Sequence, residues 1–166
     1  MPESPLTSQP TIQELRTFYD QEFKRAHIKD EDRAYQWMAR RRFKTYIEGK
    51  TVLDIGCGGG FFLKELRGIT SSAIGMDLSG EALQIASQDT PKSSLVQGNA
   101  EQLPFLSKSF DVVFCLGSLE HFSDITGALR EMGQLVQPGG WIFLMVPNLF
   151  WYKDIISVLR TGDIGP

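Results

Sequence analysis

Several features that mark other protein classes are missing from this 166-residue sequence. No run approaches the roughly 18 apolar residues expected of a membrane-spanning helix. The opening residues, MPESPLTSQP, have neither the basic nor the apolar region of a secretion signal. The formal net charge is only -3, which gives no reason to expect nucleic acid as a partner. These absences predict a soluble, cytoplasmic protein without a membrane span.

Cysteine is also scarce. The two cysteines, Cys57 and Cys115, lie far apart, and neither belongs to a CxxC or Cys/His pattern. A zinc site needs clustered ligands and a disulfide framework needs more cysteines, so we expect neither a metal site nor a disulfide. A reducing cytosol is the simplest compartment for such a chain.

What is present is the composition of a folded domain, with 42% hydrophobic and 11% aromatic residues. A chain of this length can bury one hydrophobic core and is short for two, so we expect a single domain over residues 11–166. Residues 1–10 contain three prolines and several small polar residues, which predicts a flexible tail.

Residues 11–48 contain neither glycine nor proline and predict a helical preface. Its expected helices are Ile12–Ala26 and Asp30–Ile47. The basic run Ala39–Lys44 is expected to be a solvated face rather than a surface for an acidic substrate.

Residues 49–148 alternate short apolar runs with segments of helical periodicity, the pattern of a parallel sheet covered on both faces. The expected strands, rich in Val, Ile, Leu and Phe, are Thr51–Ile55, Ala73–Met76, Ser94–Gln97, Asp111–Leu116 and Trp141–Val146. An apolar stripe at helical spacing predicts a helix before the last strand, made by Ile125, Ala128, Leu129, Met132, Leu135 and Val136. The turn Pro138-Gly139-Gly140 is expected to stop this helix. The fold class is therefore α/β, with a Rossmann-like, doubly wound and mostly parallel sheet.

The most informative stretch, Val52–Phe62, runs from an apolar strand through a glycine cluster into a helical pattern. Glycines permit a tight turn there and let a ligand approach the main chain. The free N–H groups of the new helix favour an anionic group, either a phosphate or a carboxylate. The dinucleotide fingerprint G-x-G-x-x-G would need glycine in place of Phe61, which disfavours a nicotinamide dehydrogenase.

The cluster reads Asp-x-Gly-x-Gly-x-Gly, from Asp54 through Gly56 and Gly58 to Gly60. In this it resembles the first motif of class I S-adenosylmethionine-dependent methyltransferases. The resemblance implies that Asp54 orients the loop near the amino group of the cofactor's methionine part, and that Cys57 lies in the same binding turn. A carboxylate suits a ligand with an ammonium group and would be unfavourable beside a pyrophosphate.

A second mark is Asp77, which follows the second expected strand and lies 23 positions after Asp54. A carboxylate there can accept hydrogen bonds from both ribose hydroxyls, and Leu78 can pack on the adenine. Alternatively, Asp77 merely caps the helix whose start Ser79 and Glu81 indicate. Its register with the glycine cluster favours the ribose role.

A third mark is the loop Gly98–Phe105, which resembles the family's adenine-binding loop. There an Asp side chain accepts from the adenine amino group and the next backbone N–H donates to the ring. In this sequence Asn99 replaces the Asp, with Ala100 after it. An amide oxygen still accepts that hydrogen bond, but without charge assistance, so we expect a weaker contact.

A fourth mark, Ser109–Phe122, resembles the motif that passes beside the reactive sulfonium, at Leu116–Leu119, and then approaches the acceptor. His121 is the candidate catalytic residue, since an unperturbed imidazole titrates near pH ~6.5 and can accept a proton from an acceptor hydroxyl. The alternative is that His121 has no catalytic role and only fixes the loop by hydrogen bonds.

The resemblance covers Lys50–Asn148 and is nearest to small-molecule methyltransferases of the quinone-biosynthesis type. It implies methyl transfer from S-adenosyl-L-methionine to a small-molecule O, N or C acceptor by direct displacement. An aminopropyl-type transferase and a non-catalytic cofactor-binding subunit stay open as alternatives. The preface aromatics Tyr19, Tyr35 and Trp37 either form a lid over the cofactor or simply dock the preface.

Members of this family usually continue past the fifth strand with a helix and two antiparallel strands. Because few residues follow Val146, residues 149–166 are expected to be a truncated C-terminal segment without those strands, with a helix at Leu149–Arg160. The fifth strand would then have a bare, apolar edge and favour self-association.

Overall fold

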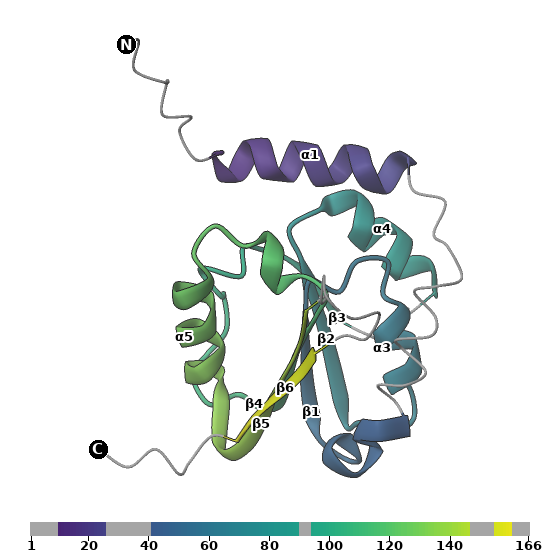
Figure 1. Cartoon of the computed structure of the whole chain (residues 1–166). Coiled ribbons are helices and arrows are strands. Elements are labelled where there is room, and N and C mark those ends of the chain that lie inside the picture. Colours follow the sequence, from purple (N-terminus) through teal and green to yellow (C-terminus); the bar gives the residue numbers. More distant parts are fainter. Residues whose placement is uncertain (1–9, 26–40, 90–93, 147–154, 161–166) are drawn as a thin grey trace, which may run out of the picture.

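The computed structural model describes residues 10–25, 41–89, 94–146 and the backbone of 155–160. These residues contain one six-stranded sheet of order β3-β2-β1-β4-β5-β6 (Figure 1). Its strands are β1 (Thr51–Ile55), β2 (Ser72–Asp77), β3 (Ser94–Gln97), β4 (Phe110–Leu116), β5 (Val136–Val146) and β6 (Ile155–Arg160). Neighbouring strands are parallel except β5 and β6. The expected doubly wound, mostly parallel sheet is confirmed.

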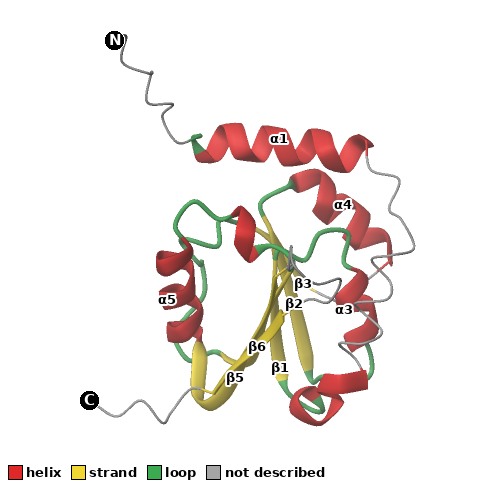
Figure 2. Ribbon diagram, viewed as in Figure 1, coloured by secondary structure: helices red, strands yellow, loops and turns green. Residues whose placement is uncertain are grey.

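The helices lie on both faces of this sheet (Figure 2). One face carries α3 (Phe61–Leu66), α4 (Gly80–Asp89) and a short helix over residues 41–47, called the 41–47 helix below. The other face carries α5 (Ile125–Leu135). The short 3-10 helix η1 (Leu119–His121) follows β4. A further helix, α1 (Ile12–Arg25), lies across the end of the sheet near α4. No helix among the described residues is long and apolar enough to cross a membrane.

The central strands are mostly apolar because both faces of the sheet are covered. In β4, Val112 and Phe114 pack with α3 and the 41–47 helix, whereas Val113 and Cys115 pack in the layer that includes α5. Each of these four side chains is at most 1% exposed. Their burial fixes the strand register, since a slip of one residue would exchange the two layers.

An aromatic cluster holds the 41–47 helix against the sheet. The ring of Phe43 lies 4.3 Å from that of Phe143, which stacks on Phe114 at 5.0 Å. Phe62 of α3 meets Phe114 edge-on at 4.7 Å. Such pairs contribute about 0.5–1.5 kcal/mol each beyond the apolar area they bury. The second preface helix is therefore part of the core where the structure describes it, and its predicted residues 30–40 lie outside the described ranges.

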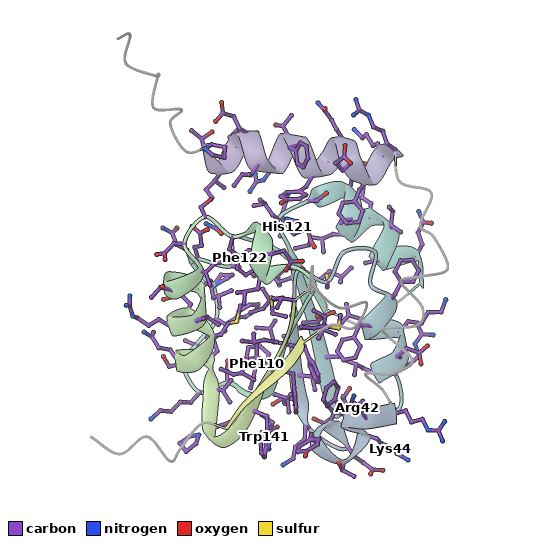
Figure 3. The ribbon with its side chains drawn as sticks, in the orientation of Figure 1. Arg42, Lys44, Phe110, His121, Phe122 and Trp141 are labelled. Atoms are coloured by element: carbon purple, nitrogen blue, oxygen red, sulfur yellow. The ribbon has the colours of Figure 1, made fainter. Side chains whose placement is uncertain are left out.

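The basic run predicted to be a solvated face has exposed side chains at Arg41, Arg42 and Lys44. Arg42 and Lys44 lie at the end of the molecule away from His121 and Phe122 (Figure 3). These basic residues are therefore remote from the end where the parallel strands finish.

The predicted stop of α5 is misplaced. The helix begins at an N-cap, Asp124, whose side chain accepts from the N–H of Gly127, and it ends at Leu135. Val136 is already extended and pairs with Phe110, so Pro138-Gly139-Gly140 lies inside β5. The irregular residues are absorbed by a register shift between β4 and β5.

The prediction of a helix at Leu149–Arg160 is wrong for residues 155–160, which form β6. Residues 149–154 lie outside the described ranges. β6 pairs antiparallel with β5 from Trp141 to Val146. The fifth strand therefore has an outer neighbour, and the bare edge from which self-association was expected does not exist. The error arose because Ile155, Val158 and Leu159 fit a helical stripe, although β-branched residues also favour strands.

Candidate functional site

The glycine turn between β1 and α3 has a backbone that only glycine adopts readily. Gly56, Gly58 and Gly60 have φ of 72°, 51° and 76°, in the left-handed region. The N–H groups of Gly56 and Cys57 both donate to the carbonyl of Met76, at 2.8 and 3.0 Å. The turn is thus fastened to β2, which brings it beside the carboxyl end of that strand.

Close packing of the turn on β2 depends on a glycine outside the cluster. A Cβ at Gly75 would collide with Leu63 of α3 and would lie 2.9 Å from the sulfur of Cys57. In dinucleotide-binding domains the third glycine of the fingerprint allows helix and strand to approach. Here Phe61 occupies that place, and Gly75 provides the space from the strand instead. Sequence reasoning missed this residue. A glycine inside a strand can indicate close approach of another segment, but the sequence does not show which segment approaches it.

Asp77 is tied to the glycine turn. Its Oδ2 accepts from the N–H of Gly58 at 2.8 Å, and its Oδ1 accepts from the N–H of Ser79 at 2.9 Å. The N-cap of α4 is Ser79, whose hydroxyl accepts from Ala82 N at 3.1 Å. The alternative role of Asp77 as the α4 cap is therefore filled by another residue. Backbone N–H groups thus orient the carboxylate of Asp77 at the carboxyl end of β2.

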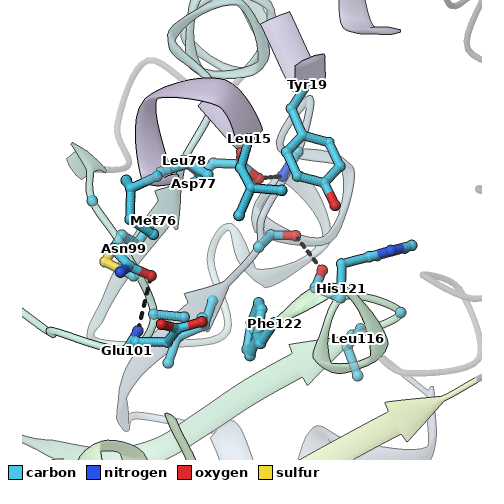
Figure 4. Close-up of a pocket in the computed structure, with 18 of the residues that line it drawn as sticks. Leu15, Tyr19, Met76, Asp77, Leu78, Asn99, Glu101, Leu116, His121 and Phe122 are labelled. Carbon is cyan, nitrogen blue, oxygen red and sulfur yellow. Dashed lines mark hydrogen bonds between the residues drawn. The ribbon is translucent and has the colours of Figure 1, made fainter. Parts of the chain in front are cut away.

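A cavity of about 290 Å³ opens at the carboxyl ends of β1, β2, β3 and β4 (Figure 4). This is where the strand order reverses, the usual ligand position in open parallel sheets. Seven of the ten cofactor residues predicted from the sequence line it, namely Gly56, Gly58, Asp77, Leu78, Asn99, Ala100 and Leu116. His121 lines it as well. Asp54, Cys57 and Gly60 do not line it. Asp54 lies within β1, the Cys57 side chain packs toward Gly75 of β2, and Gly60 is the N-cap of α3.

The cavity's electrostatics favour a ligand that carries positive charge. Asp54 is 2% exposed, and burial together with the negative charge of Asp77 raises its pKa well above the usual range. Burial also raises the pKa of Asp77. No lysine or arginine is among the described residues that line the cavity. Because burial disfavours the charged form of both carboxyls, a cationic ligand such as an ammonium or sulfonium would stabilise that form.

The loop after β3 folds back on itself beside the cavity. The side-chain oxygen of Asn99 accepts from the N–H of Glu101 at 3.1 Å, and Asn99 bridges to Gln102. Glu101 in turn accepts from the N–H groups of Ser123 and Asp124, at 2.8 and 3.0 Å. The adenine-loop candidates are thus braced against the segment after η1. One lone pair of the Asn99 oxygen remains for a ligand donor.

The opposite wall combines η1 with α1. The ring of Tyr19 meets His121 edge-on, with centroids 6.0 Å apart, and both residues line the cavity (Figure 4). Nε2 of His121 lies 3.9 Å from a carboxylate oxygen of Glu120. The pKa of Tyr19 is raised, first by burial and then by the negative charges of Asp77 and Glu120.

Helix α1 supplies cavity residues that the sequence prediction did not place there. Ile12, Leu15 and Phe23 line the cavity together with Tyr19. Their spacing of three and four residues puts them on one helical face, which was the available signal. The lid alternative for Tyr19 thus agrees with its position, whereas Tyr35 and Trp37 lie outside the described residues.

Comparison with known proteins identifies the family. Residues 53–144 match the family model described as a methyltransferase domain. The chain belongs to this methyltransferase domain family. The ubiquinone biosynthesis O-methyltransferase of Burkholderia vietnamiensis is 36% identical over 128 residues, which is 72% of this chain and 54% of that protein. An uncharacterized protein of Methanocaldococcus jannaschii is 39% identical over 121 residues, or 72% of this chain and 46% of that one.

Solved structures agree. The YcgJ protein of Bacillus subtilis has a TM-score of 0.60 at 31% identity, covering 63% of this chain and 48% of that one. A putative methyltransferase of Haloferax volcanii, solved with a methyltransferase activator, has a TM-score of 0.63 at 30% identity and covers 77% of this chain and 57% of its own. This methyltransferase domain spans about half the length of the curated relatives it matches. The hydrogen-bonding groups of the cavity fit S-adenosylmethionine, the cofactor expected from the sequence.

Proposed function

We propose that this chain transfers the methyl group of S-adenosylmethionine to an oxygen, nitrogen or carbon atom of a small-molecule acceptor. The observation that carries the proposal is the cavity in which Asp77 and the glycine turn meet the loop of Asn99. When bound, S-adenosylmethionine supplies a methyl carbon made electrophilic by the positive sulfonium. Such a reaction needs no protein nucleophile or metal.

The proposed cofactor roles follow from the positions of the side chains. The carboxylate of Asp77 accepts hydrogen bonds from the ribose hydroxyls, since the N–H groups of Gly58 and Ser79 fix its orientation. Asn99 accepts from the adenine amino group, the N–H of Ala100 donates to the ring, and Leu78 packs against its face. Buried behind the turn, Asp54 compensates the positive charge of the methionine amino group and keeps Gly56, Cys57 and Gly58 in place.

On the acceptor side, His121 is the proposed proton acceptor. Its imidazole lines the cavity, with Nε2 3.9 Å from a carboxylate oxygen of Glu120. General-base catalysis by such a group contributes typically about 10²–10⁴-fold. If His121 only supports the loop, its replacement lowers activity but leaves the acidic limb of the pH profile in place.

The proposed acceptor class is a flat, largely apolar molecule with a hydroxyl group. Tyr19, Phe23, Phe122 and Leu116 give the cavity aromatic and aliphatic walls. The relatives named ubiquinone biosynthesis O-methyltransferase support an oxygen acceptor of this kind. A carboxylate acceptor would find no cationic side chain among the described lining residues.

A screen with radiolabelled cofactor tests the function across phenols, quinols, amines and carboxylic acids. We expect methyl transfer to phenols or quinols, with Asp77→Ala as the matched cofactor-site control. The activity of His121→Gln should fall, and the part of the pH dependence that is due to the imidazole should disappear. Cofactor binding without transfer to any acceptor class would instead support the non-catalytic binding alternative. Transfer of an aminopropyl group from a decarboxylated cofactor would support the aminopropyl-type transferase alternative.

A further inference from the structure

Helix α1 covers the cavity although it has few attachments of its own. No residue of α1 is buried, and its apolar residues Leu15, Tyr19 and Phe23 face the cavity. A 14-residue helix is marginally stable in water by itself. Its position over the cavity therefore depends on what fills the cavity and on its contacts with α4.

The strongest of these contacts is made by Asp20. Its Oδ1 accepts from the hydroxyl of Ser79 at 2.6 Å and from the N–H of Glu81 at 3.3 Å. A second contact joins Lys24 to Glu81, with Nζ and Oε1 3.1 Å apart. Asp20 thus places a carboxylate from α1 on the N-terminal turn of α4, where unpaired N–H groups favour negative charge. The Ser79 hydroxyl is the main cause that holds the pKa of Asp20 below its usual range.

Ser79 joins this contact to the cofactor site. The residue is fully buried, with 0% exposure. Its hydroxyl donates to Asp20, and its N–H donates to Asp77, which accepts from Gly58 in the glycine turn. One continuous chain of hydrogen bonds therefore runs from the covering helix to the carboxylate assigned to the ribose.

We propose that Asp20 is a latch that holds α1 over bound cofactor, with Ser79 as the positioning residue that couples the latch to Asp77. The inference rests on the proposed cofactor binding. A ligand in the cavity covers the apolar face of α1, while the latch supplies the polar attachment on the neighbouring face of that helix. Release of the cofactor then requires the Asp20 contacts to break.

The test compares cofactor affinity and dissociation rate in four proteins: wild type, Asp20→Ala, Asp20→Asn and Glu22→Ala. The last variant removes an equal charge from α1 at a half-exposed residue that forms an ion pair with Arg25. We expect Asp20→Ala to raise both Kd and the dissociation rate about tenfold, equivalent to about 1.4 kcal/mol. The amide oxygen of asparagine still accepts hydrogen bonds, so Asp20→Asn should recover most of the affinity. Glu22→Ala should match the wild type.

A second readout separates a latch from a merely structural role. Trypsin cleavage within α1, after Lys24 or Arg25, should be slowed by saturating cofactor in wild type and in Glu22→Ala. In Asp20→Ala, saturated to the same degree, this protection should be lost while thermal melting shows a folded domain. If Asp20→Ala is folded and keeps the wild-type dissociation rate and protection, the latch is refuted and cofactor binding stands. If the wild type itself binds no cofactor, the proposed function fails and the latch with it.

Discussion

Replacing Gly56 by alanine tests whether the glycine turn is built as described. The φ of Gly56 is 72°, and the left-handed region costs an L-residue roughly 1–2 kcal/mol. A Cβ there would also collide with the Cβ and hydroxyl of Ser118, which follows β4. Overpacking of this kind costs typically about 1–3 kcal/mol. Gly56→Ala should therefore destabilise the domain by about 2–5 kcal/mol.

Two further variants separate strain from collision. Gly68 has a similar φ of 75° with nothing near its Cβ position, so Gly68→Ala should cost only the strain of roughly 1–2 kcal/mol. Ser118→Gly removes the obstacle and the hydrogen bond from its hydroxyl to the Gly56 carbonyl, 3.3 Å long and worth about 1 kcal/mol. In the double variant with Gly56→Ala, the two changes should cost less together than their sum.

Urea unfolding of the wild type, the three single variants and the double variant measures these terms. The expected coupling between Gly56→Ala and Ser118→Gly is about 1–3 kcal/mol in favour of the double variant. Cofactor affinity should remain impaired in the double variant because the turn is still strained. Equal destabilisation by Gly56→Ala and Gly68→Ala would show that the contact between the turn and Ser118 is not as close as described.

Three other outcomes are expected. Asp77→Ala should weaken cofactor binding by about 1.5–3 kcal/mol, the usual range for hydrogen bonds to a charged group. Because burial raises the pKa of Asp77, the affinity of the wild type should fall on acidification at a higher pH than expected for a carboxyl of pKa about 3.9. Calorimetry measures both effects. If neither the substitution nor the acidification changes the affinity, Asp77 has only a structural role. Asn99→Asp should bind equally well or better, since a charged oxygen accepts more strongly, and a tenfold loss would mean that this loop contacts adenine differently. Phe43→Ala should lower the free energy of unfolding by about 3–5 kcal/mol with cofactor affinity retained, and an unchanged denaturation midpoint would exclude the aromatic cluster as an anchor.

The central sheet was predictable because its strands are short apolar runs punctuated by glycine and polar residues. β1 and β3 have the predicted bounds. β4 begins one residue earlier than predicted, and β2 is one residue longer at each end, so Asp77 is its last residue. The cofactor turn was predictable for the same reason, since Gly56 and Gly58 follow a buried strand directly. β6 was not, because a short segment with apolar residues at mixed spacing fits a helix as well as a strand until its partner β5 is known.

The covering role of α1 was only one of two alternatives that sequence reasoning left open. The apolar face of Leu15, Tyr19 and Phe23 predicts that the helix packs on something, but periodicity does not say what lies beneath. Asp20 reads as an ordinary exposed acid of an amphipathic helix. Its contact with Ser79 joins positions 59 residues apart, and only the folded chain brings them together.

Titration of this chain with S-adenosylmethionine, its demethylated product and NAD tests the central claim most directly. Asp54, Asp77 and the glycine turn predict saturable binding of the first two molecules and none of NAD. At a concentration a hundred times Kd, a ligand that binds only the folded state adds about 2.7 kcal/mol of stability, so a thermal shift should accompany the heat signal. Saturable binding of NAD with no response to S-adenosylmethionine would contradict the account.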